Sequence, residues 1–125
     1  AIKRLEPYFK IVQLGQGFIR TNKEKQAEST IENANTAWNY AKKEIFSDLY
    51  DVVILDEINN MIDYGLLNVD DVITLLENKP ARLNVILTGR NAHNKIIELA
   101  DTVTEMREVK HHYKKGVKAK KGIEF

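Results

Sequence analysis

The chain has 125 residues, of which 43% are hydrophobic and 30% are charged, and its formal net charge is +1. This length and composition predict one globular domain, residues 1–125, with a single core. A net charge so close to zero gives no electrostatic reason to expect nucleic acid or an acidic membrane as a partner. The chain has no cysteine, which excludes disulfides, thiolate metal sites and cysteine nucleophiles.

Targeting and membrane-spanning segments are not evident in the sequence. No apolar run approaches the roughly 20 residues that a helix needs to cross a bilayer. The first residues also lack the charged-then-apolar order of a signal peptide, so we expect a cytoplasmic protein. The chain starts with Ala1 rather than Met, and we therefore expect further residues upstream.

Four short apolar runs predict strands, at residues 9–14, 51–55, 84–88 and 102–109. The second and third runs are continuous and rich in β-branched residues, which is typical of strands buried on both faces of a parallel sheet. The fourth run alternates between apolar and polar residues, as edge strands often do.

Helical periodicity lies between these runs. Residues 22–49 carry apolar side chains at intervals of three and four, and Trp38 is expected in the core. Asn68 predicts the N-cap of a second helix, which ends before the next proline. A third helix is predicted at 93–100, with its inward face formed by Ile96, Ile97 and Leu99. Strands that alternate with helices predict an α/β fold whose ligands bind at the carboxyl ends of the strands.

The strongest local motif is the apolar run Val52 to Leu55 followed by Asp56 and Glu57. A buried strand that delivers two carboxylates at its tip has the form of a Walker B strand, whose acids hold Mg²⁺ against a triphosphate. The same two acids also suit an ordinary strand end at the start of a loop, and this segment alone leaves both interpretations open.

A second motif, Thr88-Gly89-Arg90, follows another predicted buried strand. Gly89 lets the backbone approach a ligand closely, and Arg90 offers a planar fork for phosphate or carboxylate oxygens. Taken alone, the stretch fits an ordinary turn with a solvated arginine better.

The third motif is the loop at 15–22, which contains two glycines and Phe18. It follows the first predicted strand, so we expect Phe18 at the same sheet edge as Asp56, Glu57 and Arg90. The loop is not a phosphate-binding loop, because no Gly-Lys-Ser/Thr follows its glycines. The alternative is a flexible loop with Phe18 packed in the core.

Six stretches occur together, in this order, in one known family: residues 51–57, 88–90, 99–106, 109–111, 116–119 and 121–125. They resemble the ATP:corrinoid adenosyltransferases of cobalamin biosynthesis and salvage. The likeness runs from about Leu5 to Phe125. Its most specific part is the ending, in which Gly-Val-Lys-Ala is followed shortly by Gly-Ile-Glu-Phe.

The resemblance implies a P-loop NTPase-like (RecA-like) fold, with three αβα layers around a mostly parallel sheet. In this family a glycine-rich P-loop and a further strand precede the point at which this chain begins, and neither occurs here. We therefore expect an N-terminally truncated chain, the carboxyl-terminal two-thirds of a single corrinoid adenosyltransferase domain. Without the amides and lysine that cradle the phosphates, we do not expect full activity from it.

The resemblance also implies the roles of individual residues. Mg²⁺ or Mn²⁺ would be held by Asp56 and Glu57. The nucleotide would be lined by Thr88, Gly89 and Arg90. The corrinoid would be lined by Gly17, Phe18, Asn22, Met61 and Tyr64. The catalytic residues would be Phe18, Arg20 and Glu57. Some members have Trp at the position of Arg20, where an aromatic loop helps to displace the lower base of the corrinoid from cobalt; Arg20 would instead meet a corrinoid side chain or phosphate.

The reaction implied by the resemblance transfers the 5'-deoxyadenosyl group of ATP to Co(I) of cob(I)alamin or cobinamide and releases triphosphate. Other implied partners are a second copy of the chain in a homodimer and a flavoprotein electron donor. Two alternatives remain open from the residues: an ATPase that hydrolyses ATP, with Glu57 polarising water, and a non-catalytic corrinoid-binding protein without a P-loop.

Overall fold

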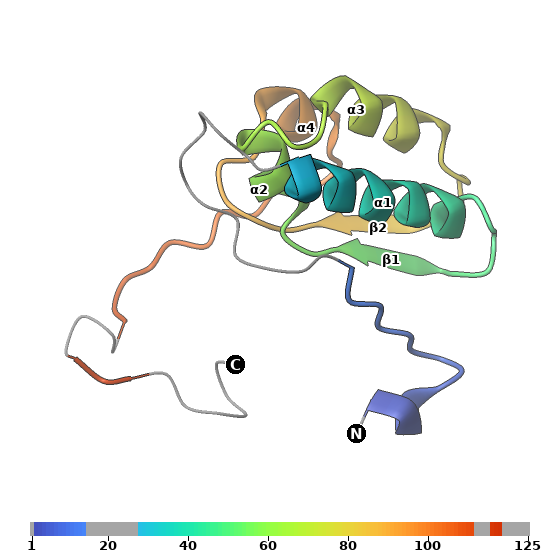
Figure 1. Ribbon diagram of the computed structural model, residues 1–125, viewed down its shortest axis with the longest axis horizontal. Coiled ribbons are helices and arrows are strands. Elements are labelled where there is room, and N and C mark those ends of the chain that lie inside the picture. Colours follow the sequence, from blue (N-terminus) through green and yellow to red (C-terminus); the bar gives the residue numbers. More distant parts are fainter. Residues whose placement is uncertain (1, 15–27, 112–115, 119–125) are drawn as a thin grey trace.

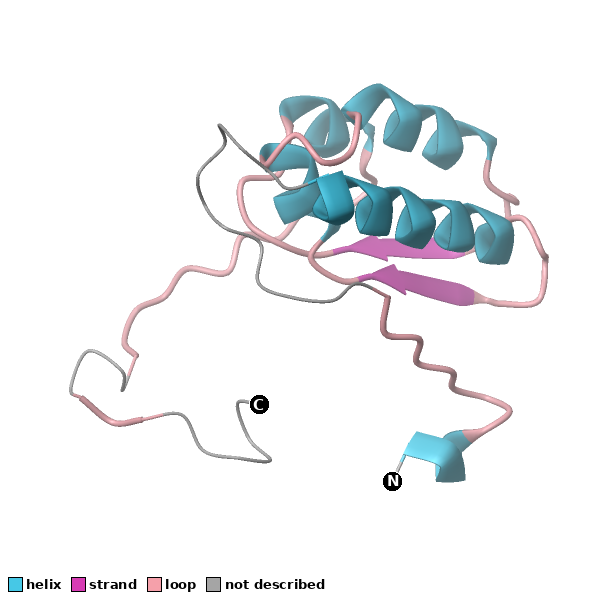
Figure 2. Cartoon of the chain, in the orientation of Figure 1, coloured by secondary structure: helices cyan, strands magenta, loops and turns pink. Residues whose placement is uncertain are grey.

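The computed structural model describes residues 2–14, 28–111 and 116–118. Two strands and four α-helices occur in these ranges, together with one short 3₁₀ helix (Figures 1 and 2). In chain order the elements are η1 (Ile2–Leu5), α1 (Glu28–Ile45), β1 (Val52–Leu55), α2 (Ile58–Asp63), α3 (Val69–Asn78), β2 (Asn84–Leu87) and α4 (Asn94–Leu99). No helix in the described ranges is both long and apolar enough to span a membrane.

Strands β1 and β2 form a parallel pair, in which Val53 lies opposite Val85 and Leu55 opposite Leu87. The Thr88 N–H continues the pairing beyond the strands by donating to the Leu55 carbonyl at 3.2 Å. The predicted α/β class with a parallel sheet is thus confirmed. Because the strands are parallel, the turns that follow them lie at the same edge of the sheet.

One face of this sheet is covered by helices (Figure 1). Alternate strand residues turn toward this face and pack against the core. They are Val53, Leu55, Val85 and Leu87. All four α-helices contribute buried residues to that core, which includes Trp38, Ile45, Ile58, Val72, Leu75 and Ile96. Trp38 is only 6% exposed, which confirms its predicted place in the core. The hydrophobic effect therefore holds the sheet and helices together as a single layered unit.

The opposite face of the sheet is apolar but exposed. Val52, Ile54 and Ile86 retain 47%, 53% and 47% of their accessible surface. The prediction that both strands are buried on both faces was therefore wrong for the described residues. The helices in the described ranges cover only one face of the sheet. The second helical layer of a three-layer αβα arrangement stays a prediction.

Two predicted strands are not observed. Residues 9–14 and 102–109 are described, yet neither stretch forms a strand. A strand exists only through its ladder to a neighbour, and no described strand pairs with either stretch. The alternating pattern at 102–109 therefore predicted the wrong structure, and Met106 and Val109 are each 93% exposed.

Lys10 anchors the 9–14 stretch to the rest of the chain. Its Nζ lies 3.5 Å from Glu44 Oε2 at the end of α1 and 3.4 Å from the Tyr50 hydroxyl. The Tyr50 hydroxyl donates a hydrogen bond to Glu44, which lowers the pKa of that carboxyl and raises the pKa of Tyr50. Side-chain contacts of Lys10, rather than strand pairing, thus join this stretch to the end of α1 and to Tyr50.

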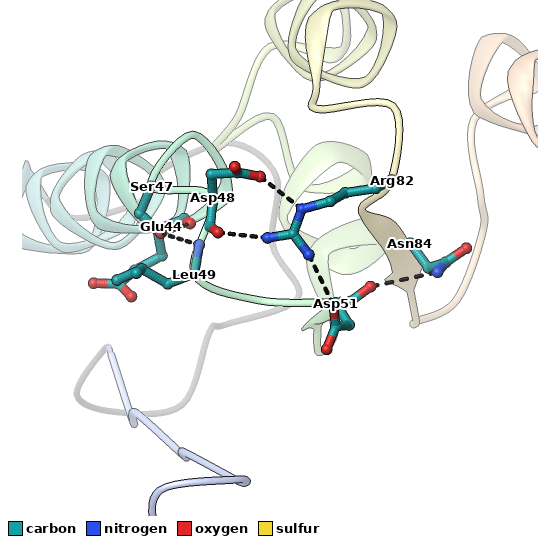
Figure 3. A network of polar contacts seen from close by, with 7 residues as sticks. All are labelled: Glu44, Ser47, Asp48, Leu49, Asp51, Arg82 and Asn84. Atoms are coloured by element: carbon teal, nitrogen blue, oxygen red, sulfur yellow. Dashed lines mark hydrogen bonds and ion pairs between the residues drawn. The ribbon is translucent and has the colours of Figure 1, made fainter.

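The amino ends of the strands are joined by a clamp around Arg82 (Figure 3). Its Nε donates to Asp48 Oδ1 at 2.9 Å and its Nη1 to Asp51 Oδ1 at 2.8 Å. Its Nη2 also donates to the Asp48 carbonyl, and Asp48 has a φ of 59°. This clamp joins the turn before β1 to the turn before β2, at the opposite end of the sheet from the two acids of the Walker B-like motif.

The described parts of the predicted helices are largely confirmed: of the helix predicted at 22–49, residues 28–45 form α1, and residues 22–27 lie outside the described ranges. Helix α3 begins after Asn68, whose Oδ1 accepts from the Asp70 N–H at 2.8 Å, as the N-cap prediction requires. Helix α4 begins after His93, but only Ile96 is buried there. Ile97 and Leu99 are 41% and 37% exposed, because a helix of six residues has fewer than two turns to present to the core.

The N-cap of α3 provides a test of this fold. Asn68→Ala removes the side-chain acceptor, and we expect it to lower the free energy of unfolding by about 1 kcal/mol. Asn68→Asp keeps an acceptor at the same position and should preserve stability. Urea denaturation followed by circular dichroism measures both variants. Equal losses in the two variants would contradict the capping role.

Candidate functional site

Two turns meet at the carboxyl edge of the sheet. The first turn holds Asp56 and Glu57, directly after β1. The second holds Thr88, Gly89 and Arg90, directly after β2. Since Leu55 and Leu87 are paired in register, the turns begin side by side. The structure therefore brings together the acidic pair and the Thr88-Gly89-Arg90 motif.

The Thr88 hydroxyl joins the two turns directly. Its Oγ1 donates to Asp56 Oδ1 at 2.6 Å and accepts from the Glu57 N–H at 2.9 Å. One hydroxyl thus uses both its donor and an acceptor across the two strand ends. The contact fixes the orientation of the Asp56 carboxylate, while no contact to its Oδ2 is seen among the described residues.

Glu57 has a left-handed backbone, with φ 58° and ψ 19°. This conformation is unfavourable for a residue with a Cβ atom and commonly persists at functional sites, where the surroundings hold it. Here the Thr88 hydroxyl holds the Glu57 N–H, and the Glu57 carbonyl accepts from the Asn60 N–H at 3.0 Å. As a result the exposed Glu57 side chain extends from the tip of β1, where α2 begins.

Gly89 allows the second turn to approach α2 closely. Its φ is 128°, and a Cβ atom there would lie 2.8 Å from Asn60 Oδ1 and 3.0 Å from the Asn59 Cβ. The Arg90 N–H donates to Asn60 Oδ1 at 2.6 Å, and the Asn59 N–H donates to the Thr88 carbonyl at 3.1 Å. A residue with a Cβ atom would be strained at this φ and would crowd Asn59 and Asn60, so the close approach requires glycine.

Asn59 and Asn60 were missed at the sequence level. Both lie within three residues of the acidic pair, after Ile58, but this closeness in sequence does not show what they contact. Helix α2 itself was also not predicted, because six residues are too few for a clear helical period. Only the tertiary structure shows that these asparagines face the turn after β2.

The other predicted site residues are placed as follows. Arg90 is exposed, and no described residue pairs with its guanidinium. Met61 is partly buried against the core, and Tyr64 is the half-buried C-cap of α2. The remaining predicted residues lie outside the described ranges: Gly17, Phe18, Arg20 and Asn22.

The donor set at this edge suits a hard divalent cation. Asp56 and Glu57 both offer exposed carboxylates, and oxygen is the ligand that Mg²⁺ prefers. In the part of the chain that the structure describes, no cluster of three or more acidic, histidine or cysteine side chains could hold a metal. Two carboxylates fit an ion that completes its coordination with water and substrate phosphates.

Comparison with known proteins assigns the chain to a family. The ATP:corrinoid adenosyltransferase family BtuR/CobO/CobP matches it over residues 1–125. The chain belongs to this family. The resemblance inferred from the sequence is thereby confirmed, and neither the hydrolysing ATPase nor the non-catalytic corrinoid-binding protein is favoured.

Curated relatives agree with the family assignment. The chain is 40% identical to a corrinoid adenosyltransferase of Pseudomonas aeruginosa, in a match that covers 90% of this chain and 54% of that protein. It is 36% identical to corrinoid adenosyltransferase CobA of Salmonella typhimurium and 37% identical to a corrinoid adenosyltransferase of Escherichia coli K12. Each match covers 97% of this chain and 61% of the relative. The chain thus spans between half and two-thirds of the length of these relatives.

The left-handed conformation of Glu57 leads to a prediction about stability. Glu57→Gly should be more stable than Glu57→Ala by about 1 kcal/mol, because glycine adopts this backbone without the steric cost that alanine retains. Urea denaturation of the two variants gives the difference directly. If Glu57→Ala were as stable as Glu57→Gly, the backbone at this position would not be strained.

Proposed function

We propose that this chain carries the metal-binding and part of the nucleotide-binding side of an ATP:corrinoid adenosyltransferase. The proposed reaction moves the 5'-deoxyadenosyl group of ATP to Co(I) of a reduced corrinoid, cob(I)alamin or cobinamide. The observation that carries the proposal is the Thr88 hydroxyl bridge between Asp56 and Glu57, which sets two carboxylates beside a glycine–arginine turn. Family membership supports the choice of reaction.

The proposed reaction needs no nucleophile from the protein. Co(I) of the substrate donates an electron pair to C5' of ATP, so that a cobalt–carbon bond forms. The bond between C5' and the triphosphate oxygen breaks, and its electron pair leaves with triphosphate. Because the corrinoid supplies the nucleophile, the protein acts by aligning the two substrates and neutralising the leaving group.

The turns after β1 and β2 suit that neutralisation. Asp56 and Glu57 would hold Mg²⁺ or Mn²⁺, which when bound supplies positive charge to the triphosphate. Arg90 offers its guanidinium to phosphate oxygens, and no described residue competes for it. Thr88 and Gly89 bring backbone close to the nucleotide, since Gly89 has no side chain to block it.

The corrinoid side of the site is proposed from the family resemblance. The corrinoid would be lined by Gly17, Phe18 and Asn22 together with Met61 and Tyr64. Phe18 would help to displace the lower base of the corrinoid, and Arg20 would contact a corrinoid side chain or phosphate. A cytoplasmic homodimer supplied with electrons by a flavoprotein completes the proposal.

We also propose that the described layers are part of a larger, P-loop NTPase-like αβα fold. The apolar sheet face formed by Val52, Ile54 and Ile86 supports this, because such a face is normally covered. On this proposal the chain corresponds to the carboxyl-terminal part of the domain. The coding sequence upstream of Ala1 should then encode Gly-Lys-Ser/Thr within about 100 residues, the span of a small domain.

The reaction is tested with the protein expressed from its complete reading frame. Anaerobic incubation with ATP, Mg²⁺ and chemically reduced cobalamin should give a light-sensitive adenosylated product, followed by absorbance. Triphosphate should appear in equal amount. Phosphate release that proceeds without corrinoid would contradict the proposal and indicate hydrolysis instead.

The metal role of Glu57 has its own test. Glu57→Gln keeps the size of the side chain but removes its charge, and we expect adenosylation to fall about a hundredfold or more at fixed Mg²⁺. Glu77→Gln, on the exposed side of α3, is the matched control and should retain activity. Normal activity of Glu57→Gln over a Mg²⁺ titration would show that Glu57 is not a metal ligand.

A further inference from the structure

Three polar contacts join one side of α2 to the turn after β2. The Glu57 N–H donates to Thr88 Oγ1 at 2.9 Å, and the Arg90 N–H donates to Asn60 Oδ1 at 2.6 Å. The third contact runs from Asn91 Nδ2 to Asp63 Oδ2 at 2.9 Å. Positions 57, 60 and 63 are three apart and therefore lie along one side of a helical turn. The contacts form a row along the turn after β2.

Asn60 provides the central contact of this row. Its side-chain carbonyl holds the backbone of Arg90, while the guanidinium of Arg90 has no partner among the described residues. The contact depends on Gly89, because a Cβ atom there would lie only 2.8 Å from Asn60 Oδ1. The Asn60 side chain can therefore hold the Arg90 backbone only because Gly89 has no side chain.

The side chain of Asn59 shows that this arrangement carries an unfavourable free-energy term. It is 6% exposed, and its Oδ1 is buried without a hydrogen-bond partner among the described residues. Its backbone N–H is nevertheless fixed by the Thr88 carbonyl. An unpaired buried carbonyl is unusual and costly in native proteins, so its presence here marks a local cost beside the two turns.

We propose that Asn60 is a positioning residue of the adenosyl-transfer site, which sets the place of Arg90 relative to Asp56 and Glu57. This inference rests on the proposed function. A metal held by the two carboxylates and the cation of Arg90 must reach the same triphosphate as it departs. Asn60 does not touch the substrate in this proposal; it fixes the distance between the two turns. Displacements of about 1 Å in such alignments can cost on the order of a hundredfold in rate.

The first arm of the test measures the contact itself. In the ¹⁵N-labelled protein, Asn60→Ala should shift the Arg90 amide proton upfield and accelerate its exchange with solvent. Asn60→Asp keeps an acceptor oxygen at the same position and should leave the Arg90 amide protected. Asn78→Ala, an exposed asparagine at the end of α3, is the matched control and should leave it unchanged.

The second arm measures catalysis by the protein expressed from its complete reading frame. We expect Asn60→Ala to lower kcat for adenosylation tenfold or more, with KM for the corrinoid within about twofold of the wild type. Asn60→Asp should recover most of that loss. In an Arg90→Ala background, Asn60→Ala should have no further effect on kcat, since a positioning residue acts only through the group it positions.

Each outcome decides between named explanations. An active wild type with an equally active Asn60→Ala overturns the inference alone, as does a further loss of kcat in the Arg90→Ala background. An inactive wild type overturns the proposed function, whatever the Arg90 amide shows. If Asn60→Ala does not fold, Asn60→Ser replaces it, because a serine hydroxyl is too short to reach the Arg90 N–H; the same losses are expected.

Discussion

Parallel pairing of β1 with β2 is the constraint on which the site depends. The register that sets Leu55 opposite Leu87 also sets the two following turns side by side. A single hydroxyl, on Thr88, then joins them by hydrogen bonds to Asp56 and Glu57. Antiparallel pairing would have placed the acids and the glycine–arginine turn at opposite ends of the sheet. The parallel direction of the strands therefore brings the two turns together, and side-chain contacts then fix them.

The two ends of the sheet are held in different ways. At the amino end, Arg82 closes an exposed clamp on the turns before both strands, through Asp48 and Asp51 (Figure 3). At the carboxyl end the Thr88 hydroxyl joins the turns that follow both strands. Both ends contain a left-handed residue, Asp48 in the clamp and Glu57 beside Asp56, and the carboxyl end adds the buried side-chain carbonyl of Asn59, which has no partner among the described residues. A buried polar atom without a partner, beside the two carboxylates, is a local cost of the kind that clusters at functional sites.

Two observations agree with the proposal that the described layers are part of a larger domain. The matches cover between half and two-thirds of the curated relatives, and the described residues leave Val52, Ile54 and Ile86 exposed. The chemistry proposed for the family needs no side-chain nucleophile, which agrees with a site composed of carboxylates, a hydroxyl and an arginine. The described residues offer charge and position, the two contributions that the proposed reaction would require of the protein.

Local sequence determined the elements whose signals are local. The β-branched runs specified β1 and β2, Asn68 specified the start of α3, and the apolar spacing of α1 placed Trp38 in the core, because short-range sterics, capping and periodicity act within a few residues. The sequence could not determine whether residues 9–14 and 102–109 form strands, since a ladder needs a partner from elsewhere in the chain. It also could not show that Asn60 holds Arg90 or that Thr88 bridges the acids. Those contacts join residues about thirty positions apart, and only the packed sheet and helices bring them within hydrogen-bonding distance.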